Sequence, residues 1–359
     1  MKTIGVSTCG GDCPGLNAVI HSVVKAAVLG HGWRVLGIQD SFEGLVWPER
    51  VRELKLDDVS GLLSRGGTIL GTTNRLNPLR YELRENGALR TCNLADRCVA
   101  NAKMLGLDGL VVVGGDGTMR IALELYRRGL PLVGIPKTID NDLQGTEISF
   151  GFDTALYTAT EAIDKIHTSA ESHHRVMLVE LMGRNAGWIA LQAGIASGAD
   201  VILLPEIPFH ISKVCEEVLR REKAGRNFTI VAVAEGIKLP PELHAEFDRQ
   251  QHPPGCPKSV SEVLREVIAC RTGKESRLTV LGYIQRGGVP TPFDRILCTR
   301  FGVAATELIA RNEFGRMVCL KDGRIRSVPL EEAAQGVKLV DPQGELVRAA
   351  RAIGVSFGD

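Results

Sequence analysis

Two short motifs in this sequence carry side chains that suit phosphoryl transfer. Residues 114–118 read Gly-Gly-Asp-Gly-Thr, and residues 136–142 read Pro-Lys-Thr-Ile-Asp-Asn-Asp. Each directly follows an apolar run of strand length, at residues 110–113 and 132–135. A glycine turn between a strand and a helix lets backbone N–H groups approach a phosphate, and the start of the helix attracts its charge.

Asp116 lies inside the first motif, where a carboxylate and a phosphate would otherwise repel each other. A carboxylate among phosphates is a ligand for Mg²⁺, which binds through oxygen atoms and water. The helix after this turn is predicted to begin near Thr118 and to run to Arg128, with Ile121 and Leu125 at helical spacing. We therefore predict a nucleotide site with its metal.

The second motif supplies an ammonium, a hydroxyl and two carboxylates. Asp140 and Asp142 lie two residues apart, so in an extended segment both would face one side. One would accept the proton of an attacking hydroxyl, and the other would anchor the loop or the water shell of the metal. The alternative is a polar loop in which Asp142 caps a turn. Either motif alone recurs by chance, but the two in succession rarely do.

Composition is that of a globular enzyme. With 359 residues the chain is too long for one ordinary core, so two domains are expected. The formal net charge is only +1, without long blocks of one sign, which argues against general binding to nucleic acid or anionic membranes. Apolar runs stay shorter than a membrane span, and Met1 is followed almost directly by a strand, which leaves no room for a signal peptide. We expect a cytoplasmic protein.

The nine cysteines are an odd number scattered along the chain, which fits reduced thiols better than a disulfide framework. Cys9 and Cys13 are close in sequence, but a second pair of ligands does not follow them, and the histidines lack the spacing of a zinc site. A structural zinc is therefore not expected.

Strands alternate with helical stretches along most of the chain. They are predicted at residues 3–7, 34–38, 110–113, 132–135, 176–181, 201–204, 229–234 and 278–283. The first helix is predicted at residues 16–29, an inserted loop at 238–258, and a final helix within 337–359. This pattern predicts an α/β protein with two doubly wound, mainly parallel-sheet domains and ligands at the carboxyl ends of the strands.

Two common nucleotide-binding classes do not match. The turn at residues 10–15 fits the G-x-G-x-x-G fingerprint poorly, and the strand that ends at Ile38 is not closed by a ribose-binding acid. The sequence also lacks G-x-x-x-x-G-K-[ST]. A dinucleotide dehydrogenase and a Walker-type NTPase are therefore disfavoured.

The second half places arginines beside predicted strands. Arg175 opens one strand and Arg184 follows its end, while Arg277 and Arg286 bracket the last strand. Four guanidiniums near a common strand-end face would bind a substrate that already bears phosphate, and Glu235 would accept a sugar hydroxyl. Taken singly, each arginine is more simply a partner in a surface ion pair.

With both motifs and the arginine series in this order, the chain resembles the 6-phosphofructokinase family from residues 10–15 through residues 284–288. The resemblance implies transfer of the γ-phosphate of ATP to the 1-hydroxyl of fructose 6-phosphate, giving fructose 1,6-bisphosphate and ADP. It also implies two α/β domains with the active site between them. The larger, nucleotide-binding domain would span residues 1–150 and about 284–336, and the smaller, sugar-phosphate and regulatory domain residues 151–283 and about 337–359.

Functional residues follow from the resemblance position by position. Asp140 would be the base that takes the hydroxyl proton, and Thr138 and Arg184 would support the transferring phosphoryl group. The nucleotide site, with Asp116 on the Mg²⁺, would comprise Gly11, Arg75, Gly115, Asp116, Gly117, Thr118 and Lys137. The sugar-phosphate site would comprise Thr138, Ile139, Asp140, Arg175, Met182, Gly183, Arg184, Glu235, Arg277, Tyr283 and Arg286.

In this family the equivalents of Arg175 and Arg277 reach across from a neighbouring subunit, so a homo-oligomer, a dimer or tetramer, is implied. Arginines that bind effector phosphates in bacterial enzymes are replaced here by His21, Lys25 and His167. Because histidine is mostly neutral above a pH of about 6.5, allosteric control by diphosphate effectors should be weaker or more dependent on pH.

The phosphoryl donor is marked by two residues that point in opposite directions. ATP-using members carry glycine at position 117, where diphosphate-using members place aspartate, whereas Lys137 is typical of diphosphate users. We favour ATP, because an absent side chain admits the nucleotide and an added cation does not exclude it. A diphosphate-dependent enzyme is the alternative. Tyr283 stands where bacterial enzymes often carry histidine.

Rival functions share only part of the pattern. NAD kinases and lipid kinases also carry Gly-Gly-Asp-Gly-Thr, but not the second motif and the arginine series in this order. A phosphosugar sensor without turnover is a further alternative, and the presence of Asp116, Asp140 and Arg184 together speaks against it.

Overall fold

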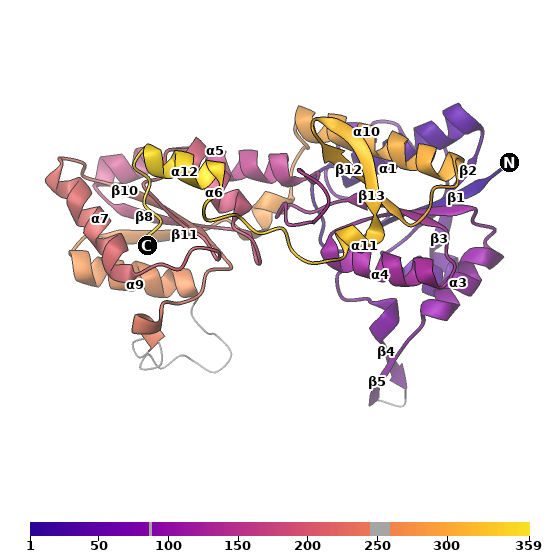
Figure 1. Ribbon diagram of the computed structural model, residues 1–359, viewed down its shortest axis with the longest axis horizontal. Helices are drawn as coiled ribbons and strands as arrows, with labels where there is room; N and C mark the ends of the chain where they lie inside the picture. The colour runs from indigo at the N-terminus through magenta and orange to yellow at the C-terminus, as the bar shows by residue number, and fades with distance from the viewer. Residues whose placement is uncertain (86–87, 245–258) are drawn as a thin grey trace. The chain divides into compact units, whose positions relative to one another are not determined.

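Two sheets of mainly parallel strands organise the chain, one in each of two units (Figure 1). The computed structural model describes residues 1–85, 88–244 and 259–359. Unit 1 comprises residues 1–139, 143–154 and 286–337, and unit 2 comprises residues 140–142, 155–285 and 338–359. The predicted fold class, α/β with mainly parallel sheets, is confirmed.

The sheet of unit 1 has the strand order β13-β12-β7-β6-β1-β2-β3. Its strands are β1 (Thr3–Thr8), β2 (Arg34–Ile38), β3 (Val51–Leu54), β6 (Gly109–Gly114), β7 (Leu132–Pro136), β12 (Arg316–Lys321) and β13 (Arg324–Pro329). Neighbours are parallel except at the edges, where β3 and β13 run antiparallel to β2 and β12. In the centre, Val6 of β1 lies opposite Val111 of β6 and Gly37 of β2. Central strands with helices on both faces read as continuous apolar runs, as β6 does.

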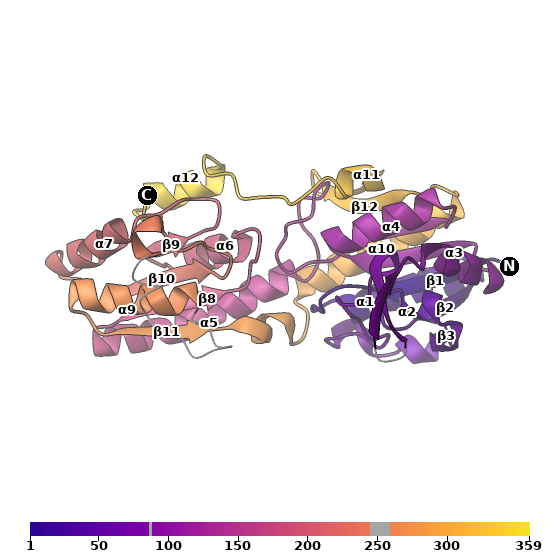
Figure 2. The same cartoon turned by 90° about the horizontal axis from the view of Figure 1, so that it is seen from below.

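Helices cover both faces of this sheet (Figure 2). On one face α1 packs against α10, and on the other α2, α3, α4 and α11 enclose a cluster of buried apolar side chains. Their bounds are α1 (Leu16–Lys25), α2 (Glu43–Val46), α3 (Ala95–Met104), α4 (Asp116–Arg127), α10 (Pro292–Ala310) and α11 (Leu330–Ala333). The predicted helix at 16–29 is present, but it widens into a π-helical turn over Ala26–Gly30.

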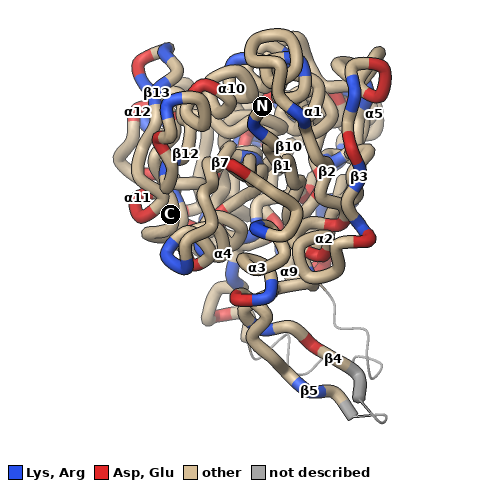
Figure 3. The backbone as a smooth tube through the Cα atoms, turned by 90° about the vertical axis from the view of Figure 1, so that its right-hand side faces the viewer, with Lys and Arg blue, Asp and Glu red and all other residues tan. Residues whose placement is uncertain are grey.

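A hairpin of β4 (Tyr81–Glu85) and β5 (Ala88–Cys92) extends from the rest of unit 1 (Figures 1 and 3). At its base the Tyr81 hydroxyl donates to the buried Glu43 carboxylate, 2.8 Å from Oε1, and accepts the Trp47 indole N–H at 3.2 Å. Arg97 stacks on Trp47, with its guanidinium carbon 4.0 Å from the ring centroid. Because an isolated two-stranded ribbon is marginal in water, this anchor stabilises the hairpin.

The sheet of unit 2 is entirely parallel, in the order β11-β8-β10-β9. Its strands are β8 (Val176–Leu181), β9 (Val201–Leu203), β10 (Thr229–Ala234) and β11 (Ser276–Val280), and its helices are α5 (Phe152–His173, which begins in unit 1), α6 (Trp188–Ala196), α7 (Ile211–Lys223), α9 (Val260–Thr272) and α12 (Glu345–Ala352). The connection from β8 to β9 crosses the sheet in one direction, whereas the connections from β9 to β10 and from β10 to β11 cross it in the other. Right-handed crossovers therefore put α6 on one face and α7 and α9, which pack together, on the other.

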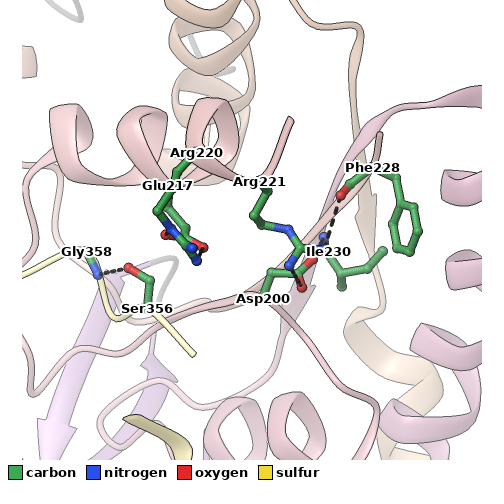
Figure 4. Close-up of polar contacts among 8 residues, drawn as sticks. All are labelled: Asp200, Glu217, Arg220, Arg221, Phe228, Ile230, Ser356 and Gly358. Carbon is green, nitrogen blue, oxygen red and sulfur yellow. Dashed lines mark hydrogen bonds and ion pairs between the residues drawn. The ribbon is translucent and has the colours of Figure 1, made fainter. Parts of the chain in front are cut away.

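The end of the chain is built into unit 2. Ser356 bridges to Val201 as a parallel neighbour of β9, and the Phe357 side chain is buried. Next to this bridge, Asp200 accepts the Ile230 N–H at 2.9 Å and pairs with Arg221 at 2.7 Å (Figure 4). The pair satisfies two charges that are largely withdrawn from water, which ties α7 to the sheet.

One predicted strand is wrong in position. A strand was expected at residues 278–283, but β11 is Ser276–Val280, and Gly282–Arg286 form a 3-10 turn. Gly282 has a φ of +47°, which ends the extended conformation. The predicted final helix is present as α12, whereas most of the predicted loop at 238–258 lies outside the described residues.

Other features bear on the expectations from composition. Charged residues of both signs are interspersed along the backbone, in keeping with the net charge of +1 (Figure 3). Within the described residues, a helix long and apolar enough to cross a membrane does not occur. The cysteines that the structure describes are free, and burial raises the pKa of the Cys9 thiol to about 11 and that of Cys13 to about 12.

Asp294 links the start of α10 to the start of α5. Its carboxylate is fully buried and accepts the Gly151 N–H at 2.9 Å, the Thr154 N–H at 2.9 Å and the Thr154 hydroxyl at 2.5 Å. Burial raises the pKa of Asp294 to about 6, although these donors act in the opposite direction. The carboxyl group is therefore the acceptor on which three buried donors depend.

We expect Asp294→Ala to lower the free energy of unfolding by about 3 kcal/mol, because three buried donors lose their acceptor. Chemical denaturation followed by circular dichroism measures this. Asp96→Ala is the control, since that carboxylate on α3 is 86% exposed. Equal stability of both variants would contradict the structural role given to Asp294.

Candidate active site

The carboxyl edge of the unit 1 sheet contains a topological switch point. The chain leaves β1 toward β2 on one side, whereas it leaves β6 toward β7 on the other. The two connections diverge at the carboxyl ends of β1 and β6, which is the usual ligand position in such sheets. The loop at residues 9–15 and the turn at Gly115 lie there, joined by the Cys9 N–H, which donates to the Val113 carbonyl at 2.8 Å.

The turn after β6 presents the start of α4 without a side-chain cap. Gly115 is the N-cap residue, and α4 begins at Asp116, two residues before the predicted start. Thr118 is buried in the first turn, whereas Gly117 is exposed, and a Cβ added there would have no neighbour within 4 Å. The helix therefore offers unused N–H groups and an open face to an anion.

Asp116 is the predicted metal ligand at this position. Its carboxylate lies one helical turn before Arg120, whose Nε donates to Oδ1 at 3.1 Å and whose Nη2 donates to Oδ2. Burial raises the pKa of Asp116, and the neighbouring guanidinium partly opposes that shift. A desolvated carboxylate at a predicted phosphate site suits a divalent cation. Among the described residues, clusters of three or more metal-binding side chains do not occur, so a cation here would depend on phosphate oxygens and water as well.

Two cations hold the carbonyl groups of the loop at residues 9–15. The buried Lys137 ammonium donates to the Gly11 carbonyl, and Arg286 Nη1 donates to the Asp12 carbonyl at 3.1 Å. A Cβ at Gly11 would lie 2.6 Å from Arg286 Nη1, so glycine is needed for the guanidinium to lie there. Burial lowers the pKa of Lys137, and Arg286 adds to that shift. Both side chains therefore hold backbone carbonyls of this loop.

A second loop lies beside the first. The Thr72 hydroxyl donates to the Gly10 carbonyl at 2.6 Å, and the Gly10 N–H donates to the Thr73 carbonyl at 3.2 Å. Arg75 follows on the same loop, exposed, with its N–H bonded to Thr73 Oγ1 at 3.1 Å. The structure thus brings the loop that carries Arg75 to the loop that carries Gly11.

The segment after β7 is a turn and not an extended strand. Lys137 still bridges to Phe150, but Asn141 has a φ of +51°, so the expectation that Asp140 and Asp142 share one face of an extended segment is wrong. The Thr138 carbonyl accepts the Ser149 hydroxyl at 2.8 Å within unit 1. Ile139 is the last residue of that unit before Asp140. The unit boundary therefore falls within the second motif.

Residues predicted to bind sugar phosphate gather at the carboxyl edge of the unit 2 sheet. Met182, Gly183 and Arg184 follow β8, and Glu235 follows β10, with its N–H donating to the Leu181 carbonyl at 2.8 Å. A Cβ at Gly236 would lie 2.2 Å from the Arg184 carbonyl oxygen. The two turns are in backbone contact, and Arg184 and Glu235 lie on exposed positions there.

The connection after β11 joins the same edge. Gln285 Oε1 accepts the Met182 N–H at 3.3 Å, and the Leu281 N–H donates to the Glu180 carbonyl at 3.1 Å. Tyr283 lies on this 3-10 turn, with its side chain 83% exposed. Its phenol is thus available to a ligand.

Arg175 and Arg277 lie at the opposite edge of this sheet. Arg175 directly precedes β8, and Arg277 is the second residue of β11, opposite Met177. Both guanidiniums bind Glu275, at 2.9 and 2.5 Å, and the hydrogen bond from Arg175 lowers the pKa of Glu275. The prediction of four guanidiniums near a common strand-end face is wrong within one chain, because parallel strands start and end on opposite edges.

The predicted effector residues are divided between the units. His21 and Lys25 lie on α1, and burial lowers the pKa of His21. His167 lies on α5 in unit 2, where its ring packs edge-on against Phe228, with 4.9 Å between centroids. Each unit therefore carries part of the set.

Sequence reasoning missed several side chains of this site. Thr72 acts through a hydroxyl that donates to a backbone carbonyl, a contact that leaves no pattern in a sequence. The Asp116–Arg120 pair was missed because the helix was predicted to begin near Thr118, after Asp116; with the observed start at Asp116, the spacing of four residues indicates an ion pair.

A switch point, an uncapped helix start and a partly buried carboxylate lie together in this α/β fold, an arrangement that suits a phosphorylated ligand. Residues 3–309 match the family model described as "Phosphofructokinase". The chain belongs to the phosphofructokinase family.

Relatives of known name match over the full length. "ATP-dependent 6-phosphofructokinase 2" of Clostridium perfringens is 49% identical over 364 residues, covering 100% of this chain and 99% of the relative. "ATP-dependent 6-phosphofructokinase" of Chloroflexus aurantiacus is 50% identical over 358 residues, covering 100% of this chain and 98% of the relative.

Solved structures show the same fold. Pichia pastoris phosphofructokinase in the T-state superposes with a TM-score of 0.79 at 32% identity, covering 98% of this chain, which spans only 36% of that longer chain. The pyrophosphate-dependent phosphofructokinase of Nitrosospira multiformis gives a TM-score of 0.82 at 21% identity, over 100% of this chain and 93% of that one. The second likeness bears on the fold alone.

We expect Lys137→Met to fold with nearly unchanged stability but to bind ATP about tenfold more weakly. Methionine fills the same space without the cost of a buried charge, yet it does not donate to the Gly11 carbonyl, so the loop loses its order. Melting temperature and calorimetric ATP titration measure the two effects. Lys165→Met is the control, because that side chain is 73% exposed on α5. Wild-type ATP affinity in both variants would refute the role of Lys137 in holding the loop.

Proposed function

We propose that this chain transfers the γ-phosphate of ATP to the 1-hydroxyl of fructose 6-phosphate, a kinase step of glycolysis. The observation that carries the proposal is the open, uncapped start of α4 beside the loop at residues 9–15, at the switch point of the larger sheet. The full-length likeness to relatives named ATP-dependent 6-phosphofructokinase supports both the substrate and the donor.

In this proposal unit 1 binds the nucleotide. The backbone N–H groups at the start of α4 and the glycine loops receive the phosphates, and Arg75 lies on the adenine side. Asp116 would hold Mg²⁺ with phosphate oxygens and water. When bound, the ion supplies positive charge to the β- and γ-phosphate oxygens. Lys137 acts by fixing the loop that carries Gly11.

Unit 2 binds the sugar phosphate. Met182, Gly183 and Glu235 would contact the sugar, and Tyr283 and Arg286 are proposed as further polar contacts. Their position at strand ends supports this assignment, because strand-end loops carry ligand contacts in parallel sheets.

Asp140 is proposed as the general base, which takes the proton from the 1-hydroxyl as that oxygen attacks the γ-phosphorus. Thr138 and Arg184 would stabilise charge on the transferring group with their hydroxyl and guanidinium. Phosphoryl transfer needs alignment and charge stabilisation more than covalent chemistry, which these residue types supply.

We also propose a homo-oligomer, and the position of Arg175 and Arg277 supports it. Both lie at the edge opposite Met182 and Glu235, so a role for them in phosphate binding requires the site of a neighbouring subunit. Their shared partner Glu275 would hold both guanidiniums in place for that contact.

ATP is favoured as donor by the space at Gly117. The position is exposed and without neighbours, so a bulky nucleotide can approach it. The ammonium of Lys137 is engaged with the Gly11 carbonyl, which gives this lysine a role that does not require diphosphate as the donor.

We expect Asp140→Ser to lose turnover by about 10²- to 10⁴-fold, because the variant lacks the base, while fructose 6-phosphate still binds. A coupled assay of fructose 1,6-bisphosphate formation and calorimetry of the sugar phosphate measure both. Asp164→Ser on the exposed part of α5 is the control. Near-normal turnover in Asp140→Ser would refute the assignment, and a wild type that binds both substrates without turnover would support a sensor.

We expect Gly117→Asp to fold normally but to lower kcat/KM for ATP at least tenfold, because a new carboxylate faces the phosphates. The rate is measured with Mg²⁺ and either ATP or diphosphate as donor. Gly30→Asp is the matched control, since a Cβ there also meets nothing within 4 Å. Undiminished use of ATP by Gly117→Asp would contradict the donor assignment to this position.

A further inference from the structure

We propose that Arg120 is a positioning residue for the nucleotide and its metal. It neutralises the Asp116 carboxylate while the site lacks a divalent cation, and it moves onto a nucleotide phosphate oxygen when the metal takes its place. The inference rests on the proposed function and deepens it.

The first observation is the geometry of the ion pair. Arg120 Nε lies 3.1 Å from Asp116 Oδ1, and Nη2 donates to Oδ2, so the guanidinium uses both carboxylate oxygens. A cation that binds Asp116 must take at least one of these oxygens. The arginine and a metal ion therefore compete for the same carboxylate, and arrival of the metal displaces one of the two hydrogen bonds.

The second observation is the freedom of the arginine to move. Its side chain is 56% exposed, whereas that of Asp116 is 19% exposed. Over the part of the chain that the structure describes, Asp116 is the one partner found for the Arg120 side chain. A long side chain held at a single point can turn without breaking other contacts.

The third observation is the direction in which it can turn. Arg120 lies three residues after Gly117, so both lie on one face of α4. That face is open, since a Cβ at Gly117 would meet nothing within 4 Å. A nucleotide whose phosphates sit at the start of α4 and which passes Gly117 comes within reach of this guanidinium, which pairs well with phosphate oxygens.

Charge explains why the arginine matters most before the metal binds. Without a cation, the Asp116 carboxylate would face an anionic nucleotide across a partly desolvated site and repel it. The guanidinium neutralises that charge. A bound Mg²⁺ would also neutralise it and would leave a net positive charge. Removal of Arg120 therefore harms binding of the metal-free nucleotide twice, through the bare carboxylate and the missing phosphate contact. For the magnesium complex it removes the phosphate contact and also a competitor of the metal for Asp116, so the net loss of affinity is smaller.

The test is calorimetric titration of ATP into the full chain, once with EDTA and once with Mg²⁺, without sugar phosphate. We expect Arg120→Ala to weaken binding of metal-free ATP about 100-fold and of Mg·ATP at most about tenfold, taking each lost interaction as worth about a factor of ten. Arg120→Lys should restore part of the EDTA-arm affinity, because it keeps the charge without the bidentate geometry. Arg127→Ala, on the far end of the same helix and 58% exposed, is the control and should match wild type in both arms.

A double variant separates the two effects of Arg120. In Asp116→Asn the carboxylate charge is absent, so adding Arg120→Ala should cost the same factor of about ten with or without Mg²⁺. An unchanged melting temperature shows that each variant folds. The inference would be overturned if Arg120→Ala alone lost ATP affinity by the same factor with EDTA and with Mg²⁺. It would also be overturned if this variant bound metal-free ATP as tightly as the wild type does. Wild-type protein that binds ATP in neither arm would instead overturn the proposed function, and this inference with it.

Discussion

The divergence of the chain at β1 and β6 is the constraint on which the rest of unit 1 depends. Because the connections from these parallel strands leave in opposite directions, their carboxyl ends are left uncovered. Backbone groups there must find other partners, and the loops at residues 9–15 and 71–75 supply them to one another. The same opening admits a ligand, so the need to satisfy the backbone and the need to bind phosphate are met in one place.

Cations from distant parts of the chain complete this arrangement. Lys137 directly follows β7, and Arg286 ends the 3-10 turn Gly282–Arg286; each donates to a carbonyl of the loop at residues 9–15. Arg120 performs a similar task for the Asp116 carboxylate. Positive charge in this site therefore serves first to hold the protein's own oxygen atoms.

In unit 2 the same rule of parallel sheets divides the arginines. Side chains after β8 and β10 gather at one edge, whereas Arg175 and Arg277 share Glu275 at the other. Strand direction, and not distance along the sequence, decides which of them can serve one site.

The sequence by itself determined the α/β class, the strand and helix that flank residues 114–118, and membership of the family, because these depend on local apolar runs and on short motifs. It placed β11 too late, since a positive φ at Gly282 is a single-residue property that apolar pattern does not reveal. The turn at Asn141 escaped it for the same reason. Only the tertiary structure decided that Lys137 faces the Gly11 carbonyl and that Arg175 and Arg277 lie away from Glu235. The physical reason is that such contacts join residues far apart in the chain, and strand order and direction bring them together or separate them.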